Sequence, residues 1–324
     1  MLIKELKEEN IMYKLARPFF LMCETPLHAG SGTDLGIVDM PIQRERHTGF
    51  PKIEGSTIKG CIRQRFRDLP NIKFRGKDLN PKEIEQCINM IFGPENGGDF
   101  AASLGITDAR VLLFPVKSVK GVYALITCPY VLTKFINELN MCEVKVDFEV
   151  PKEKATPKNS NLFVSDNKVV LEEYTFQIEH MEDDNCTRLA QWLAEKLVPA
   201  TKEYGPIKEK ISKDILVLSD DEFRDFVQWS TEVVTRTKID VNTGTVSSRA
   251  LFTEEYLPEQ TVLYALALAA PVFAPDKGVL DDGEASTVME FIKDNLPEII
   301  QIGGDATIGK GITRVGKELL GGEA

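Results

Sequence analysis

The segment from residue 232 to residue 252 restricts the possible folds most. Two extended segments, 232–240 and 245–252, flank Asn242-Thr243-Gly244. A short polar turn that ends in glycine, placed between two extended segments, indicates an antiparallel β-hairpin. Strands and helices alternate irregularly around this hairpin. We therefore predict an α+β sheet of the split β-α-β type and not a doubly wound parallel sheet.

The remaining patterns place helices between strands. They predict strands at 17–25, 110–116, 121–127 and 261–270, and helices at 57–68, 81–92, 130–139, 185–197, 220–229 and 284–295. Ser56 is the expected N-cap of the first helix, whose buried stripe is Ile58, Ile62 and Phe66. Most of 150–215 is polar and irregular. We therefore expect a single domain over 1–324, with a variable helical insertion at 150–231 and a projecting hairpin at 232–258.

Composition excludes several classes of protein. The longest uncharged apolar run, 261–274, is too short to span a bilayer and contains Pro271, and the charged N-terminus does not resemble a signal peptide. We expect a cytoplasmic protein with no membrane partner. The six cysteines form no C-x-x-C pair, and the chain has only three histidines. A disulfide framework and a zinc site are therefore not expected.

The charge is unevenly distributed. The chain has a formal net charge of -11, yet residues 41–75 contain nine Lys or Arg and three acidic residues. That segment carries +6 and leaves -17 for the rest. Within it, Lys59, Arg63 and Arg67 recur every four residues on the predicted helix and form a basic stripe. The stripe could meet successive phosphates of a nucleic acid, or it could be an ordinary solvated helix face.

A long glycine-containing segment precedes this helix. It runs from His28-x-Gly30-x-Gly32 to Asp39-Met40-Pro41 and on to Arg44. Long loops in compact domains are commonly functional. Asp39 could hold a divalent cation near phosphates or help to deprotonate a ribose 2′-hydroxyl, and His28 could transfer a proton. From chemistry alone, a turn-forming aspartate and a loop histidine are the simpler interpretation.

Two further segments are candidates for RNA contacts. The glycine-rich stretch 303–311 contains Gly304 and Lys310, but Gly311 stands where a Walker A motif needs Ser or Thr. A nucleotide-binding P-loop is therefore not expected, although the glycines allow the backbone to approach a phosphate or a base. The hairpin carries Arg236 and Arg249 on its two arms. It could wedge between nucleotides or be a plain surface hairpin.

Taken together, these motifs resemble the RAMP superfamily of CRISPR systems and, within it, the backbone subunit of type III-B (Cmr) effector complexes. The resemblance rests on PLHAGSGTDLGIVDMPIQRERHTGFPKIEGSTIKGCIRQRF, on the hairpin followed by LFTEEYLP, and on IGGDATIGKGITRV. These motifs lie at both ends of the chain and in the hairpin, about a third of its length.

The resemblance implies a modified ferredoxin-like (RRM-like) palm with a thumb hairpin. It also implies copies of the chain stacked in a helical filament along a CRISPR guide RNA, with other Cmr subunits as partners. Complementary target RNA would be cut by metal-assisted endoribonucleolysis, with Mg²⁺ or Mn²⁺ held between Asp39 and RNA phosphates. The residues that match the family's site are Asp39, His28, Glu254 and Tyr256. Arg44, Lys59, Arg63, Arg67, Arg236, Arg249, Gly304 and Lys310 are the expected RNA contacts.

Other functions remain open at this stage. The chain could be a binding-only scaffold of the same fold, the Csm-type sister subunit, or a metal-free ribonuclease that processes the guide precursor. Sequence specificity would in each RNA-guided case come from base pairing with the guide, while the protein reads shape and backbone.

Overall fold

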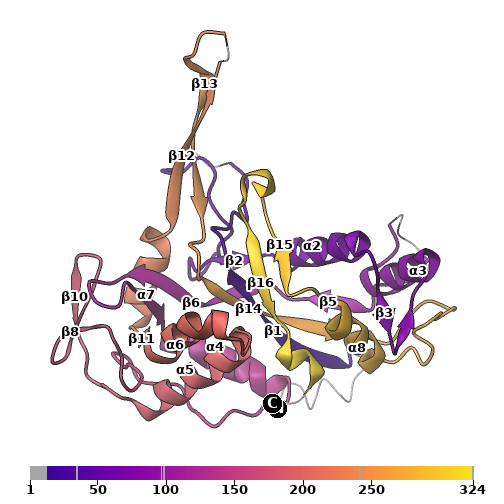
Figure 1. Cartoon of the computed structure of the whole chain (residues 1–324), viewed down its shortest axis with the longest axis horizontal. Helices are drawn as coiled ribbons and strands as arrows, with labels where there is room; N and C mark the ends of the chain where they lie inside the picture. The colour runs from indigo at the N-terminus through magenta and orange to yellow at the C-terminus, as the bar shows by residue number, and fades with distance from the viewer. Residues whose placement is uncertain (1–12, 34–35, 96, 98, 241, 323–324) are drawn as a thin grey trace.

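The computed structural model describes residues 13–33, 36–95, 97, 99–240 and 242–322, and the side chains of residues 238 and 247–250 lie outside this description. It is a mixed α+β structure, as predicted, built on one large sheet, and a separate long hairpin projects from the body (Figure 1). The path through the sheet is β11-β7-β6-β14-β1-β16-β15. All neighbours on this path are antiparallel except β11 and β7.

The central strands are β1 (Leu15–Cys23) and β14 (Val262–Ala269), which pair from Leu15 opposite Ala269 to Met22 opposite Val262. Both are largely apolar, and most of their residues are buried because helices and loops cover both faces of the sheet. The flanking strands are β6 (Ala109–Lys117), β7 (Tyr123–Thr127), β11 (Ile215–Val217), β15 (Ile299–Gln301) and β16 (Ile312–Gly316). Short strands β2 (Lys52–Ile53) and β5 (Leu104–Ile106) pair with β6 and β14.

The first long helix, α2 (Gly55–Asp68), buries Ile58, Ile62 and Phe66 as expected. Its N-cap is Glu54 and not Ser56, and no side chain of the cap residue binds the helix end. Instead Asp108 Oδ1 accepts a hydrogen bond from Gly55 N at 2.9 Å. A Cβ atom on Gly55 would lie 2.2 Å from the Ile106 carbonyl oxygen, so glycine is required by this close approach.

Further helices surround the sheet. The segment predicted at 81–92 is confirmed as α3 (Pro81–Phe92), whose cap residue Asn80 forms a capping box with Glu83. Between α2 and α3 lies the small β3–β4 hairpin (Lys73–Phe74 and Lys77–Asp78). In Figure 1, α2, α3 and α8 (Ala285–Asn295) lie to the right of the hairpin, and α4 (Pro129–Met141) lies below it.

The segment expected to be an irregular helical insertion is more ordered than predicted. Besides α5 (Asp184–Leu197), α6 (Gly205–Lys213) and α7 (Asp220–Trp229), it contains a three-stranded sheet. The strands of that sheet are β8 (Phe163–Ser165), β9 (Lys168–Leu171) and β10 (Tyr174–Gln177). Strand β11 also joins the main sheet beside β7. The description of this region as helical was therefore incomplete.

The predicted hairpin is confirmed. Strands β12 (Glu232–Ile239) and β13 (Val246–Tyr256) pair from Glu232 opposite Tyr256 outward, and they rise well clear of the body in Figure 1. At the turn, Asp240 Oδ1 accepts hydrogen bonds from Asn242 N and Thr243 N, and Gly244 has a φ of 67°. Among the described residues, no helix is both long and apolar enough to cross a membrane.

Candidate functional site at the base of the hairpin

The glycine-containing loop that follows β1 folds back on itself beside the end of β13. Its two limbs are joined by backbone hydrogen bonds from Ser31 N to Pro41 O (3.0 Å) and from Gln43 N to Ala29 O (2.8 Å). Met40 then forms a parallel bridge with Glu254 of β13. The base of the hairpin therefore fixes the outer limb of the loop, where Asp39 lies.

Asp39 is exposed, and Thr253 holds its carboxylate. Asp39 Oδ2 accepts hydrogen bonds from Thr253 N at 2.7 Å and from Thr253 Oγ1 at 2.9 Å, while Asp39 N donates to Thr253 Oγ1 at 3.0 Å. The backbone hydrogen bond from Thr253, followed by its side-chain bond, holds the pKa of the Asp39 carboxyl below its ordinary value. Asp39 is consequently a fixed, ionised carboxylate at neutral pH and a weak base.

The opposite side of the same strand carries a buried polar network. The Tyr256 hydroxyl lies 2.5 Å from Glu254 Oε2 and 2.6 Å from Asp305 Oδ2, and it accepts a hydrogen bond from Arg236 Nη2 at 2.6 Å. Burial, and then the hydrogen bonds with Asp305 and Glu254, raise the pKa of Tyr256. Burial alone would raise the pKa of Asp305, but hydrogen bonds with Tyr256 and Glu254 hold it below its ordinary value. The network ties together both arms of the hairpin and the C-terminal glycine-rich loop.

His28 belongs to this network and is only 5% exposed. Its Nδ1 lies 2.7 Å from the Glu255 carbonyl oxygen, its Nε2 lies 3.6 Å from Glu254 Oε1, and its ring meets that of Tyr256 edge-on. A carbonyl oxygen only accepts, so Nδ1 carries a proton and donates it. A Cβ atom on Gly30 would lie 2.6 Å from His28 Nε2, so the first glycine of the loop makes room for the ring.

The structure gives Arg44 an internal role that the sequence did not predict. Its guanidinium pairs with Glu255 Oε1 at 2.5 Å and donates to the carbonyl oxygens of Gly49 and Val227, both at 2.9 Å. Glu255 also accepts hydrogen bonds from Ile42 N and Thr231 Oγ1. Arg44 and Glu255 therefore fasten the exit of the loop to the hairpin.

The basic stripe of α2 is not a solvated row. Lys59 Nζ donates to the Leu104 carbonyl oxygen at 2.7 Å, and burial lowers the pKa of Lys59. Arg63 approaches Asn89 of α3 at 3.4 Å, and Arg67 pairs with Glu85 and Glu95. These three side chains are half-buried and pack against α3 and β5, so this face of α2 is not an ordinary solvated helix face. Arg65 is the exposed arginine of this helix.

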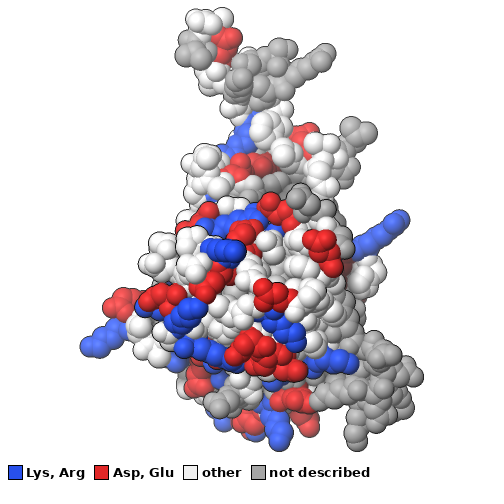
Figure 2. All heavy atoms as spheres, turned by 90° about the vertical axis from the view of Figure 1, so that its right-hand side faces the viewer, with Lys and Arg blue, Asp and Glu red and all other residues white. Residues whose placement is uncertain are grey.

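Acidic residues, most of them from other parts of the chain, pair with several cations of residues 41–75. Lys52 pairs with Glu54 and Asp108, while Arg75 pairs with Asp281, Asp282 and Glu290. Figure 2, which faces the side bearing α3 and α8, shows blue and red side chains interspersed without a continuous basic surface. A count of charges along the sequence could not predict this pairing.

The C-terminal glycine-rich loop lies directly against His28. Gly304 N donates to the His28 carbonyl oxygen at 2.9 Å, and Lys310 Nζ lies 4.9 Å from the centre of the Tyr256 ring. The strand β16 follows this loop, as the argument against a P-loop required. Asp305 is a member of the site that was not predicted from the sequence, although it lies within the glycine-rich stretch 303–311. The Arg249 side chain lies outside the described residues.

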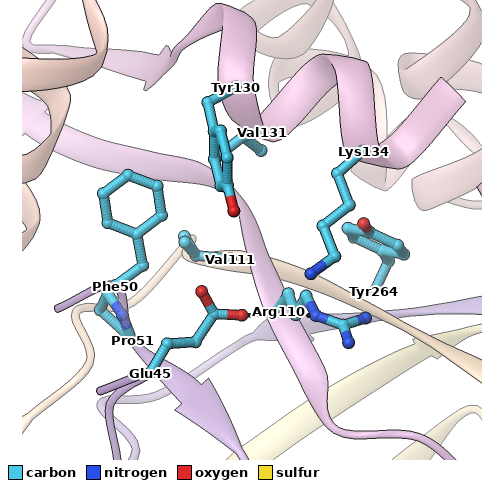
Figure 3. A pocket seen from close by; sticks show the side chains of 9 residues that line it. All are labelled: Glu45, Phe50, Pro51, Arg110, Val111, Tyr130, Val131, Lys134 and Tyr264. Carbon is cyan, nitrogen blue, oxygen red and sulfur yellow. Dashed lines mark ion pairs between the residues drawn. The ribbon is translucent and has the colours of Figure 1, made fainter. Parts of the chain in front are cut away.

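A small pocket behind the loop is part of the scaffold (Figure 3). Glu45 pairs with Arg110 at 3.3 Å, and the Phe50 ring packs edge-on against Tyr130. The pocket has a volume of only about 10 Å³, room for about one water molecule. It cannot hold a nucleotide, so the exposed surface around Asp39 is the better candidate site.

The metal expected from sequence can be tested against these residues. Among the described residues, no group of three or more His, Cys, Asp or Glu side chains could hold a metal ion. Asp39 offers one fixed carboxylate, and Mg²⁺ commonly binds through one or two carboxylates together with substrate phosphates and water. The residues therefore fit a cation shared with RNA and do not fit a metal enclosed by the protein.

The chain is similar to known proteins along most of its length. A model of the RAMP superfamily matches residues 20–314. Over 296 residues the chain is 40% identical to the CRISPR system Cmr endoribonuclease Cmr4 of Pyrococcus furiosus, a match that covers 90% of this chain and 92% of the relative. It is 25% identical over 327 residues to the CRISPR system CMR subunit Cmr4 of Saccharolobus solfataricus, covering 94% and 96% of the two chains.

Solved structures show the same likeness. The crystal structure of oligomeric Cmr4 from Pyrococcus furiosus matches with a TM-score of 0.65 at 31% identity, over 93% of this chain and 97% of that chain. A cryo-electron microscopy structure of a type III-B Cmr-β complex bound to cognate target RNA matches with a TM-score of 0.69 at 20% identity, covering 94% and 98%. At that identity the second match shows the fold alone. The chain belongs to the RAMP superfamily.

Proposed function

We propose that this chain is the backbone endoribonuclease subunit of a type III-B Cmr effector complex, and that Asp39 is its catalytic carboxylate. The observation that carries the proposal is the 40% identity, over 90% of the chain, to a relative named as the Cmr endoribonuclease. The exposed, fixed and ionised state of Asp39 supports the assignment of the residue.

The finer description of the fold is part of the proposal. The central strands lie in the order β6-β14-β1-β16, and the chain runs β1-α2-β6-β14-α8-β16 through them. This is the order of a ferredoxin-like β-α-β-β-α-β unit. We interpret this unit as the palm, and the hairpin β12–β13 as a thumb that reaches into the guide–target duplex.

In the proposed reaction, a ribose 2′-oxygen of the target attacks the adjacent phosphorus. A 2′-O–P bond forms and the P–O5′ bond breaks. The 2′-hydroxyl proton passes to water and the departing O5′ takes a proton from water, which leaves a 2′,3′-cyclic phosphate and a 5′-hydroxyl. Because the pKa of Asp39 is lowered, we assign this residue to electrostatic and ligand roles and not to proton abstraction. Asp39 would hold Mg²⁺ or Mn²⁺ jointly with RNA phosphates, and the bound cation would offset negative charge on the phosphate.

His28, Glu254 and Tyr256 act in this proposal as positioning residues. All three are buried, so none of them is placed to touch a target nucleotide. Their network fixes the end of β13, and Thr253 at the same end holds Asp39. A catalytic group must be held within a fraction of an ångström of its working position. The buried network and Thr253 hold Asp39 in this way.

The partners proposed are a CRISPR guide RNA, complementary target RNA, further copies of the chain in a helical filament, and other Cmr subunits. Base pairing with the guide would select the target, and the protein would contact backbone and duplex shape. Arg236 and Arg249 of the hairpin, with Gly304 and Lys310 of the adjacent glycine-rich loop, are the proposed RNA contacts on this side of the molecule. The main alternative is a scaffold of the same fold that binds RNA without cutting it.

Reconstitution separates these two functions. The chain would be assembled with partner subunits and a guide of known sequence, then offered a complementary target RNA and a scrambled RNA of equal length. Cleavage of the complementary RNA at fixed positions is the expected result. Tight binding of that RNA without any cleavage would support the scaffold alternative instead.

A further inference from the structure

We infer that the chain has a protein-docking cavity that receives an arginine or lysine side chain from a basic segment of a partner protein. The cavity lies between β10 and α7, near the point where α7 leads into the hairpin (Figure 1). This inference concerns a surface apart from the Asp39 site and does not depend on the proposed RNA cleavage.

The cavity is large enough for a long side chain and has an aromatic lining. Its volume is about 600 Å³, and Tyr174, Phe176, Phe226 and Trp229 line it. Tyr174 is 56% exposed and Trp229 is 67% exposed. Exposed apolar surface of this kind commonly marks an interaction site. The centre of the Phe226 ring lies 6.1 Å from that of Tyr174 and 5.9 Å from that of Phe176. These ring contacts hold the aromatic lining in place.

The acidic lining of the cavity favours a positively charged ligand. Glu172, Glu173, Glu222 and Asp225 line the cavity, and no Lys, Arg or His is found among its described lining residues. Glu222 pairs with Lys154 and Asp225 lies 3.3 Å from Arg224, but Glu172 and Glu173 have no ion-pair partner among the described residues. Such a surface attracts a cation and repels the phosphates of RNA.

The protein already binds one cation at the rim in the way we propose. Lys154 Nζ lies 4.8 Å from the centre of the Phe176 ring and pairs with Glu222. This combination of an aromatic face and a carboxylate is the arrangement that recognises ammonium and guanidinium groups. Within the cavity, Trp229, Glu173 and Asp225 offer the same two components to a side chain from outside.

Ser230 adds an independent sign of a missing polar partner. Ser230 is one of the lining residues, and its Oγ atom is shielded from solvent and has no hydrogen-bond partner among the described residues. Buried hydroxyl groups are normally hydrogen-bonded.

Trp229 provides a direct readout of binding. The chain has two tryptophans, and Trp192 is partly buried against Phe20, Phe135 and Phe148. In a Trp192→Phe variant the emission therefore reports on Trp229 alone. The probe is the capped peptide acetyl-GIRRIG-amide, and the matched control peptide is acetyl-GIEEIG-amide. If the variant does not fold, calorimetric titration of the unaltered chain with the same peptides replaces the optical readout.

We expect a saturable change with the arginine peptide and none with the glutamate peptide. The double variant Glu173→Gln and Asp225→Asn should weaken binding by about five- to tenfold, a size typical of charge and cation–π contacts. The matched control is the double variant Glu149→Gln and Glu195→Gln, which makes the same charge change at exposed positions outside the cavity. It should bind with unchanged affinity.

Three results would overturn the inference. They are equal responses to both peptides, equal affinity in the cavity variant and its control, and a saturable response of Trp229 to oligouridylate without one to the arginine peptide. The last result would instead indicate stacking of RNA bases on Trp229.

Discussion

Thr253 binds one carboxylate oxygen of Asp39 twice, through its backbone N–H at 2.7 Å and through its hydroxyl at 2.9 Å. The two residues are 214 positions apart in the chain. The contact joins the first loop to the hairpin, so the orientation of Asp39 depends on the hairpin being folded. It also leaves Asp39 Oδ1 without a hydrogen-bond partner among the described residues, available for a cation or for RNA.

Replacing Thr253 by Val should raise the pKa of Asp39. The variant keeps the shape of the side chain but removes the hydroxyl donor, so the pKa should move toward the ordinary aspartate value of 3.8. Carbon-detected NMR titration of the Asp39 carboxyl group measures the shift. Target cleavage should fall, and Thr253→Ser should restore both the pKa and the rate. An unchanged Asp39 pKa in the Val variant would show that the Thr253 hydroxyl has no part in lowering it.

Replacing Tyr256 by Phe should destabilise the base of the hairpin. The change removes the hydroxyl that lies between Glu254 and Asp305 and leaves two neighbouring carboxylates without it. We expect the free energy of unfolding to fall by about 1–3 kcal/mol, as for other buried polar groups that lose a partner. Denaturant unfolding measures this. Tyr174→Phe, which removes an exposed hydroxyl, is the control and should unfold like the unaltered chain.

Lys59 should contribute to stability more than to RNA binding. In Lys59→Met the aliphatic part of the side chain is kept and the hydrogen bond to the Leu104 carbonyl is lost, at a cost of about 1 kcal/mol in unfolding free energy. The dependence of log guide-RNA affinity on log salt should be unchanged. A slope that is shallower by about 0.7–0.9 would instead indicate a phosphate contact. Arg65→Ala, at an exposed position, should leave stability within about 0.5 kcal/mol.

Local pattern was enough to predict most of the elements. The helix at 81–92 has Pro81 in its first turn, and the hairpin has its glycine turn, so each carries its own boundary signals. Prediction failed where a tertiary contact decides the outcome. The N-terminus of α2 is bound by Asp108, which lies 53 residues away from Gly55, and no local pattern announces that bond.

The site shows the same limit. Asp39, His28, Glu254 and Tyr256 were identified through family motifs, and the structure brings them to one end of β13. Asp39 is exposed, whereas the other three residues form a buried network. This difference depends on the alternation of side chains along β13, which places Glu254 and Tyr256 on one face and Thr253 and Glu255 on the other. Thr253 carries no chemical signal in the sequence, so only the structure could identify it.

Removing divalent cations should stop cleavage without unfolding the protein. The described residues contain no cluster of three ligands, so the fold should not depend on a metal. Excess EDTA should abolish target cleavage while the midpoint of thermal unfolding stays within about 1 °C. Full cleavage in EDTA would contradict the shared-cation role of Asp39, and a large fall in the midpoint would indicate a structural metal.

The most direct test of the account is target cleavage by a complex assembled with Asp39→Asn. The substitution keeps the size of the side chain but removes its charge and most of its affinity for a cation. We predict that cleavage of complementary RNA falls by about two orders of magnitude or more, while complex assembly and target affinity stay close to those of the unaltered chain. Cleavage at the unaltered rate by a fully assembled Asp39→Asn complex would contradict the account.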